Sequence, residues 1–528
     1  MLFDLRTGAT RLLNKDYSFY ARLAATLRDH GMENILVEVF LPFKGNLSAY
    51  HYFDVWLAAG ISDLTGFHTQ AALVLQATSI LFFGSFLGAM ALLRELDMHR
   101  AIRSSVARML LALSLLFITV AKWLYPLWIP LLRMDVWGAS MFAMPKNAVV
   151  YILLFPIVIA LLRGQWMTLS LLACALSTAY TPLAPAVFLS IGILLLWAAW
   201  QKLTTLGHVL RCFIPMVVMT IAIAALYSLW GDQGQMGISM ADLITYSLSP
   251  LAIKTMVNIA GKGSFQIFIT TFPFLLLAYW ALRRVVVLRR ILLLFMLTSS
   301  FGLLSYALMH GMHDSVQLWT IINLPVANIF IWCILILTLL HHKFGRPQHA
   351  VALLLLLALM YMNIPAFHAY KSPTGVDYGP ITIVPGTSPR FAFITDKADY
   401  TSVFTKLEDV YIGSTHSLMR QFDPLFITCI SNQVIPADNE FQANRQKNST
   451  FLRYVEGLKA KGEYTGYEQA QVQFVQEFQV DYLLMSRQRP LPSYLQGIFD
   501  PSMSQTVDGY AVHVRLLHAV DTSAVHPL

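Results

Sequence analysis

Charged residues are scarce in this chain of 528 residues, because Asp, Glu, Lys and Arg make up only 12% of it, about half the share in a soluble globular protein. A single soluble domain is therefore excluded. The hydrophobic share of 56% also excludes a disordered, collagen-like or coiled-coil chain. Cysteine is scarce too: Cys174, Cys212 and Cys333 lie in or beside apolar stretches, and only Cys429 lies in a polar region. This excludes an intradomain disulfide and a zinc motif.

Long apolar runs are what the chain has in abundance. Runs close to the roughly 20 residues that cross a membrane occupy 68–93, 105–125, 147–163, 207–230, 264–282, 289–309, 317–341 and 349–368. Residues 167–200 are also apolar, but Thr181, Pro182 and Pro185 interrupt them at the middle. This stretch therefore forms either one kinked helix or a hairpin of two helices.

The distribution of basic residues decides between these alternatives. A hairpin collects most loop cations on one side, namely Arg94, Arg100, Arg103, Arg108, Arg163, Lys202, Arg211, Arg283, Arg284, Arg289, Arg290, Lys343 and Arg346. The opposite short loops then hold only Lys122, Arg133, Lys146, Lys254 and Lys262. The positive-inside rule therefore favours ten spans. The net charge of +8 reflects membrane orientation and indicates no nucleic-acid partner.

The predicted fold class is an α-helical polytopic membrane protein of about ten spans with an extracytoplasmic C-terminal α/β domain. Residues 1–66 form an extracytoplasmic loop with amphipathic interfacial helices, 67–368 the transmembrane bundle, and 369–528 the soluble domain. We expect a further helix before residue 1, because an extracytoplasmic start needs a preceding span or signal peptide.

Within 369–528, alternating strand-like and helix-like patterns predict an α/β arrangement. The predicted strands are 391–395, 425–430 and 480–486, and the predicted helices are 449–461 and 467–479. A hairpin is expected at Asp508-Gly509.

The first 66 residues carry most of the candidate chemistry. Asp16 precedes a predicted helix with Phe19, Tyr20, Leu23 and Leu27 on one side, which is suited to the membrane surface. Asp16 either caps this helix or acts as a general base, and the two roles are compatible.

A second cluster runs from Tyr50 to Trp56 and leads toward the first span. His51 and Asp54 are three residues apart and share a face of a helix, with Tyr52 between them. An interfacial aromatic belt is the competing interpretation of this cluster.

These residues resemble a known family. An Asp-x-x-x-Tyr sequence opens an amphipathic helix, a turn follows with Gly31, Glu33 and Asn34, and Tyr50-His51-Tyr52 precedes the next span. With many spans and an extracytoplasmic C-terminal domain, this order resembles the C-type (GT-C) glycosyltransferase superfamily. The resemblance implies transfer of a hexosyl or pentosyl unit, with inversion, from a polyprenyl-phosphate carrier to a lipid, glycan or protein acceptor.

The resemblance places Asp16 in the role of the family's acidic residue, with Asp54 as the second candidate. Tyr20, His51 and Tyr52 are candidates for substrate binding. An inverting transfer needs a carboxylate for the acceptor proton and donors for the departing phosphate. The candidate phosphate ligands, each also interpretable as a plain interfacial anchor, are Arg133, Lys146 and Lys262.

The sequence His310-Gly311-Met312-His313-Asp314 lies in a predicted outward loop. His310 and His313 could ligate a metal together with Asp314, or could orient a lipid phosphate, whereas a solvated turn is the competing interpretation. Their spacing matches no zinc signature, so no metal or other cofactor is predicted.

Three other classes compete with a transferase. A transporter usually places ionisable residues inside its spans, and this chain has almost none there. An O-antigen-type polymerase or ligase usually has a large loop late in the chain, and a non-enzymatic scaffold would use its outer domain to bind a partner. The expected location is a bacterial inner membrane, with membrane lipids around the spans.

Overall fold

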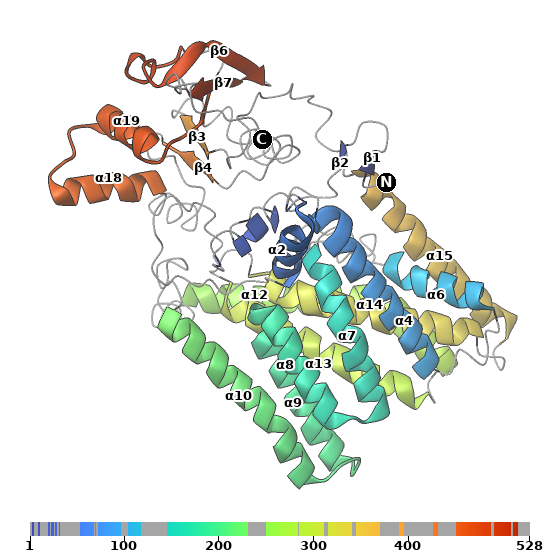
Figure 1. Cartoon of the computed structure of the whole chain (residues 1–528). Coiled ribbons are helices and arrows are strands. Elements are labelled where there is room, and N and C mark those ends of the chain that lie inside the picture. The colour runs from blue at the N-terminus through green and yellow to red at the C-terminus, as the bar shows by residue number, and fades with distance from the viewer. Residues whose placement is uncertain are drawn as a thin grey trace.

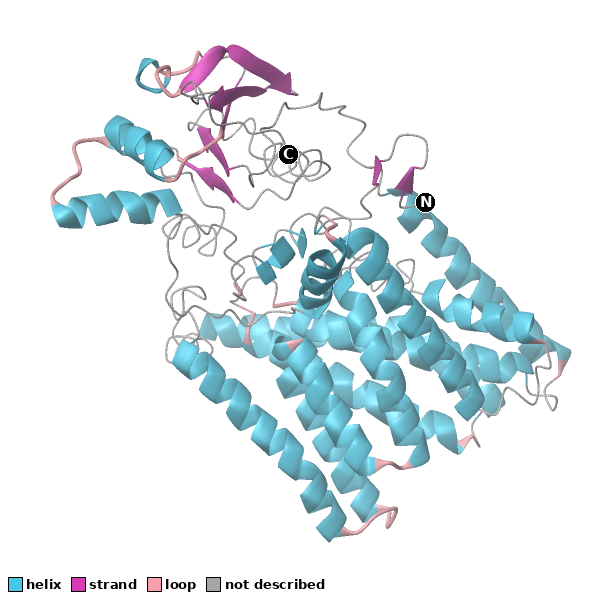
Figure 2. Cartoon of the chain, viewed as in Figure 1, coloured by secondary structure: helices cyan, strands magenta, loops and turns pink. Residues whose placement is uncertain are grey.

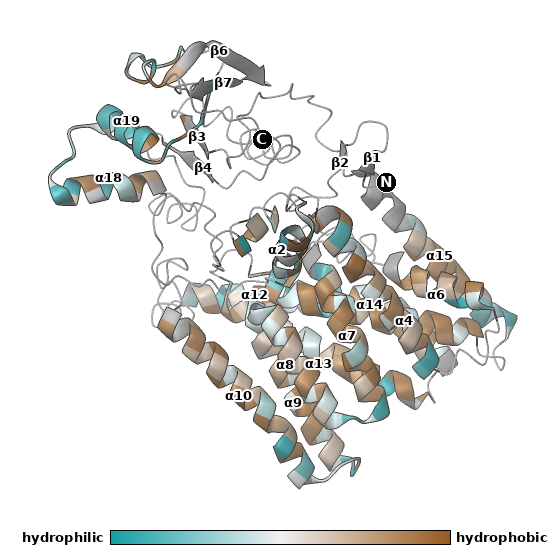
Figure 3. Cartoon of the chain, viewed as in Figure 1, coloured by the Kyte–Doolittle hydropathy of each residue, from teal (hydrophilic) through white to brown (hydrophobic). Residues whose placement is uncertain are grey.

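The computed structural model describes residues 3–4, 9–10, parts of 20–31, 53–67, 69, 72–96, 104–117, 145–230, 250–282, 285–310, 315–340, 345–369, 390–394, 426–430, 450–486, 490–507 and 510–515. Helices dominate these residues, and most of them gather in one body, whereas the strands and the helices of the C-terminal region lie beyond one end of it (Figure 2). Brown, hydrophobic residues prevail in the helical body, whereas α19 (Tyr467–Glu477) is largely teal and α18 (Thr450–Lys461) mixes brown and teal residues (Figure 3).

Every predicted apolar stretch overlaps a helix of the described residues, and residues 118–125 of the stretch 105–125 lie outside them. The bundle contains α4 (Thr78–Glu95), α6 (Ser105–Phe117), α7 (Pro145–Arg163), α8 (Trp166–Ala179), α9 (Ala184–Trp200), α10 (Leu206–Trp230), α12 (Pro250–Leu282), α13 (Val286–Leu308), α14 (Gln317–Leu340) and α15 (Arg346–Ala369) (Figure 1). Among the described residues, six helices are long and apolar enough to cross a membrane, which indicates an integral membrane protein.

The ambiguous stretch at 167–200 contains two helices. α8 ends at Ala179, and the 3₁₀ turn η4 (Thr181–Leu183) leads into α9. Tyr180, between them, has an extended backbone with φ −142° and ψ 77°. Pro182 and Pro185 fall in the first positions of η4 and α9, where a missing backbone N–H is tolerated. The prolines therefore divide the stretch rather than kink it.

α12 is the largest departure from the predicted boundaries. It begins at Pro250, whereas the apolar run predicts a start at residue 264. The added turns contain Lys254 and Lys262, and an exposed apolar stripe that includes Ile253 and Val257 continues through them. A search for uncharged runs stops at the lysines, although their long stems permit a helix at the membrane interface.

Two contacts bring three helix termini together at what we call the basic end of the bundle. Arg163, at the end of α7, forms an ion pair with Glu95, at the end of α4. Nη1 of Arg290, in the first turns of α13, donates a hydrogen bond to the carbonyl oxygen of Leu162 over 2.8 Å. Cations near the C-terminus of α7 also complement its dipole. Helix ends with predicted same-side cations therefore meet at one end of the bundle.

The opposite end is the sheet end. There the Tyr180 hydroxyl donates to Oε1 of Gln317, at the start of α14, over 3.1 Å. Figure 1 shows α2 (Phe53–Thr65), the strand pair β1 (Phe3–Asp4) and β2 (Ala9–Thr10), and the C-terminal sheet beyond this end. The first and last regions of the chain thus lie at the same end of the bundle.

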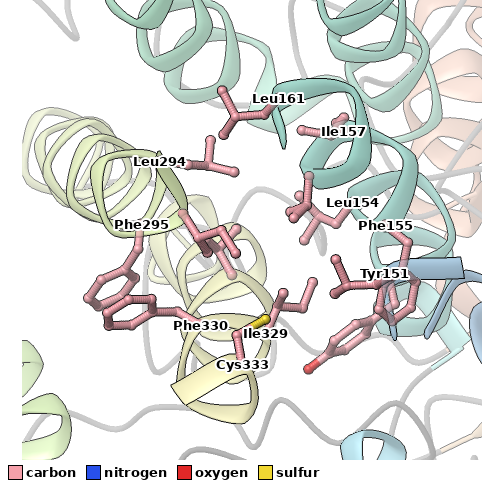
Figure 4. Close-up of a cluster of buried hydrophobic side chains, with 14 of the residues drawn as sticks. Tyr151, Leu154, Phe155, Ile157, Leu161, Leu294, Phe295, Ile329, Phe330 and Cys333 are labelled. Atoms are coloured by element: carbon pink, nitrogen blue, oxygen red, sulfur yellow. The ribbon is translucent and has the colours of Figure 1, made fainter. Parts of the chain in front are cut away.

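α14 occupies the centre of the bundle, and all residues from Trp319 to Thr338 are buried. Phe330 stacks on Phe295 of α13, with ring centroids 5.6 Å apart (Figure 4). Asn328 donates to the hydroxyl of Tyr151 of α7 over 2.6 Å. Interhelical hydrogen bonds of this kind fix rotation and register where apolar contacts alone do not.

The C-terminal strands form one mixed sheet. Its order is β4-β3-β5-β7-β6, with β3 parallel to both β4 and β5, and β7 antiparallel to both β5 and β6. The strands are β3 (Arg390–Ile394), β4 (Phe426–Cys429), β5 (Tyr482–Ser486), β6 (Phe499–Val507) and β7 (Tyr510–Arg515). Val507 pairs with Tyr510, so the residues between them are the two predicted for the hairpin.

α18 and α19 share one apolar core with this sheet. Phe451 and Phe474 are fully buried there, with edge-to-face rings 5.4 Å apart. Ala392 of β3 and Leu483 of β5 pair with each other and belong to the same core. Apolar spacing predicted each of these elements, because each strand and helix buries a face against the others.

His513 is expected to make the stability of this sheet depend on pH. The side chain is 5% exposed, neither ring nitrogen has a hydrogen-bond partner among the described residues, and burial lowers the pKa of the imidazole. The folded chain therefore holds it neutral, whereas the unfolded chain binds a proton as the pH falls below about 6.5. We therefore expect the sheet to lose stability as the pH falls from about 6.5 toward the lowered pKa of His513. The measurement is the rate at which a protease cleaves residues of the sheet in urea at each pH.

A His513→Leu variant is the control for this prediction, because it keeps the burial and removes the titrating group. The stability of the variant should change less between pH 7.5 and pH 5.5 than the stability of the wild type. These two pH values lie on either side of the ordinary histidine pKa of about 6.5. Equal pH dependence in both proteins would contradict the assignment to His513.

Candidate functional site

α2 carries the one described carboxylate among the candidate residues. Asp54 lies in the first turn of α2, where a negative charge complements the helix dipole. Its exposed fraction is 0%. An acceptor hydroxyl therefore does not reach Asp54 in this arrangement, and its role as a base stays a prediction.

The helical residues between 20 and 28 pack on α2. Tyr20, Ala21 and Ala24 are buried in one cluster with Val55 and Ala58 of α2. Small residues on both sides allow the two backbones to approach closely. Of the apolar side that the sequence predicts to lie at the membrane surface, Tyr20 and Leu23 are buried in protein. Tyr20 is consequently 1% exposed, and substrate binding by it also stays a prediction.

A hydrogen-bonded chain ties the two segments together at their ends. Nη1 of Arg28 donates to Oγ of Ser62 over 2.8 Å, and this hydroxyl donates to the carbonyl oxygen of Phe67 over 2.6 Å. Gly31 and Gly66 follow the two helices with φ of +65° and +70°, the left-handed conformation that commonly ends a helix. The position of the first helical segment relative to α2 is thus held by a directional contact as well as by packing.

The π-helix η1 (Ala72–Ala77) joins this layer to α4. Its Leu73 and Ala77 belong to the same buried cluster, and the Thr78 hydroxyl donates to the carbonyl oxygen of Leu73 over 2.8 Å. This hydrogen bond links the last turn of η1 to the first residue of α4. π-Helical turns occur often at functional sites, so this junction adds weight to the α2 region as the candidate site.

Lys262 lies in the sheet-end half of α12 and is partly exposed. One residue later, Gly263 allows close approach to α13, since a Cβ there would lie 2.4 Å from Cδ1 of Leu303. The backbone next to Lys262 therefore packs closely on α13, while the side chain of Lys262 is partly exposed.

His310 has a local structural contact. Its Nδ1 donates to the carbonyl oxygen of Ala307 over 2.8 Å, which satisfies one of the last carbonyls of α13. Within the described ranges, no group of three side chains could hold a metal ion.

The remaining candidate residues fall on other parts of the chain. Asp16, His51, Tyr52, Arg133 and His313 lie outside the described residues. Lys146 belongs to the first turn of α7, but its side chain is likewise outside the description.

Sequence reasoning overlooked two polar contacts at the sheet end. Arg28 and Ser62 are 34 residues apart, and Tyr180 and Gln317 are 137 apart. Neither pair belongs to a local motif, because only the fold brings its members together. A weak signal did exist for Tyr180, which directly precedes the Thr-Pro break in an apolar run.

Comparison with known proteins identifies no relative: the chain matches no protein-family model and no curated protein sequence. The function therefore has to be argued from the chain's own residues.

Proposed function

We propose that this protein is an integral membrane glycosyltransferase that moves a sugar from a polyprenyl-phosphate carrier to an acceptor at the sheet end of the bundle. In this proposal the ten bundle helices all cross the membrane, the sheet end is extracytoplasmic, and residues 369–528 form an α/β domain there. A bacterial inner membrane is the proposed location.

The observation that carries the proposal is the layer of α2, η1 and residues 20–28 at the sheet end. This layer contains the buried carboxylate of Asp54, the hydrogen bond from Arg28 to Ser62, and the π-helix η1 next to the apolar bundle. Polar groups built into a fixed layer at a membrane surface suit chemistry on a lipid-linked substrate. The basic end, in contrast, holds the cation-rich helix termini expected on the cytoplasmic side.

The proposed reaction balances in one displacement. The acceptor oxygen forms a bond to the anomeric carbon while the bond from that carbon to the phosphate oxygen breaks. The acceptor proton passes to the carboxylate of Asp16, and the electron pair leaves with the polyprenyl phosphate. Asp16 takes this role because Asp54 has no exposed surface. Cations at the membrane surface, with Lys262 as the described candidate, stabilise the charge of the departing phosphate.

Co-purification tests the proposal. The protein, extracted in mild detergent, should retain a polyprenyl phosphate or its sugar-linked form, detected by native mass spectrometry. Lys262→Ala should lower this retention about tenfold, the effect of losing one hydrogen bond to a charged group. Arg133→Ala is predicted to act in the same direction.

Lys461→Ala is the matched control, because Lys461 is exposed at the end of α18, outside the bundle. Retention should be unchanged in this variant. Recovery of bulk phospholipid alone, from conditions in which a known transferase keeps its carrier, would refute the proposal.

A further inference from the structure

The turn between α9 and α10 lies at an edge of the membrane. Two candidate spans meet there, because one ends at Trp200 and the next begins at Leu206. Figure 1 shows this turn at the end of the bundle that points away from the C-terminal sheet. Trp200 is 78% exposed, and tryptophan is enriched where membrane helices meet the headgroup layer. We call Trp200, Lys202 and Arg211 the α9–α10 corner.

The two cations of this corner are not used inside the protein. Lys202 and Arg211 are exposed, and neither side chain has a hydrogen bond or an ion pair with the part of the chain that the structure describes. Arg163, at the same end of the bundle, pairs instead with Glu95. The sequence has no Asp or Glu from 164 to 231, so α8, α9 and α10 offer these cations no carboxylate.

Arg211 lies on the lipid side of α10, below the edge of the hydrocarbon. It is the sixth residue of α10, about 7.5 Å from the start of the helix at 1.5 Å per residue. Ile214 and Val218, three and seven residues further on, share its face and are each 59% exposed. α10 is also the least buried of the six candidate spans in the described residues. An arginine in this position extends its side chain back toward the headgroups, where phosphate is the available anion.

A phospholipid matches both parts of this surface. A guanidinium group binds phosphate oxygens through two parallel hydrogen bonds, and each Lys or Arg near a membrane surface strengthens the attraction to anionic lipid about fivefold. The exposed apolar side chains of α10 begin at Leu206 and Leu210, directly beside the cations, and suit acyl chains. A free phosphate ion would use the cations alone, because the apolar face offers it no contact.

We propose that the α9–α10 corner binds the headgroup of an anionic phospholipid, whose acyl chains lie along the exposed face of α10. Lys202 and Arg211 attract the phosphate, and Trp200 lies beside it in the headgroup layer. The proposal concerns the lipid preference of the protein and does not depend on the sugar transfer proposed above.

Lipid titration tests the proposal. The full chain, freed of co-purified lipid in mild detergent, is titrated with dioleoyl phosphatidylglycerol or with dioleoyl phosphatidylcholine, and native mass spectrometry measures the affinity for the first bound lipid. The wild type should bind phosphatidylglycerol about 25-fold more tightly, from about fivefold for each of the two cations. Inorganic phosphate should not displace this lipid. Equal affinity for both lipids, or displacement by phosphate, would overturn the assignment.

Substitutions at the corner separate charge from structure. Lys202 has φ +57°, a left-handed conformation that glycine adopts at lower cost. Lys202→Gly should therefore raise the midpoint temperature of unfolding in neutral detergent, yet lower the affinity for phosphatidylglycerol about fivefold. A purely structural role of Lys202 would move stability and affinity in the same direction. Adding Arg211→Gln should remove most of the remaining preference, whereas Arg211→Lys, which keeps the charge, should preserve it.

Lys459→Gln combined with Lys461→Gln is the matched control, because it removes two exposed lysines from α18, outside the bundle. This variant should keep the lipid preference of the wild type. An unchanged preference after both substitutions at the corner, or an equal loss in the control, would overturn the binding surface proposed for the α9–α10 corner.

Discussion

Asp16→Asn will lower the rate of sugar transfer by about 10²- to 10⁴-fold, the usual contribution of a general base. The amide keeps an oxygen that can cap a helix but does not take a proton from the acceptor. Binding of the carrier should persist, so the loss falls on the turnover rate. The measurement is the initial rate of transfer in proteoliposomes, with the retained carrier quantified in the same preparation.

Asp63→Asn provides the control for this substitution. Asp63 is an exposed carboxylate on α2, and its variant should transfer sugar at the rate of the wild type. If Asp16→Asn kept full activity, Asp16 would be only a helix cap, and a scaffold function or a different base would have to be considered.

Gly88→Leu will destabilise the bundle more than any other single substitution proposed for it. A Cβ at position 88 would lie 2.5 Å from Cδ2 and 2.8 Å from Cβ of Phe155 on α7. Because the Cβ of Phe155 is fixed to the backbone, rotation of the ring does not relieve this overlap. We expect the free energy of unfolding to fall by about 3 kcal/mol, the upper end of the usual effect of overpacking a core. Thermal unfolding in detergent, followed by tryptophan fluorescence, measures it.

Gly261→Leu is the matched control, since Gly261 is also inside a helix but a Cβ there would meet no other part of the described chain within 4 Å beyond its own helix. It should unfold near the temperature of the wild type. Comparable unfolding of both variants would mean that α4 and α7 do not pack as described.

The positions of the bundle helices were predictable because hydrophobic length and proline placement are local properties of the sequence. Residues 167–200 illustrate this: their prolines occupy the turn and the first positions of α9. The start of α12 was not predictable in the same way, because Lys254 and Lys262 interrupt the uncharged run, while Met256 and Ile259 pack in one cluster with Leu303 and Trp319 of α13 and α14. The same holds for Gly84 and Gly88, whose spacing matters only against α7.

The candidate site was less predictable than the fold. The sequence singled out Asp54 and Tyr20, yet burial by neighbouring elements removes both from the surface. The sequence shows which side chains are chemically able to act as a base or to bind a substrate. Whether such a side chain is exposed depends on which distant segments of the chain cover it. The tie between Arg28 and Ser62 likewise required the fold, since neither residue belongs to a recognisable motif.

The enclosed position of α14 bears on how the protein is made. This helix is apolar enough to enter a bilayer, yet from Trp319 to Thr338 its finished surroundings are other helices. The side chains of α14 are therefore in contact with lipid during insertion and with other helices after assembly, and its sequence has to suit both surroundings. The neighbours α6, α7, α12 and α13 precede it in the chain and α15 follows. The bundle consequently closes around α14 only after synthesis has passed α15.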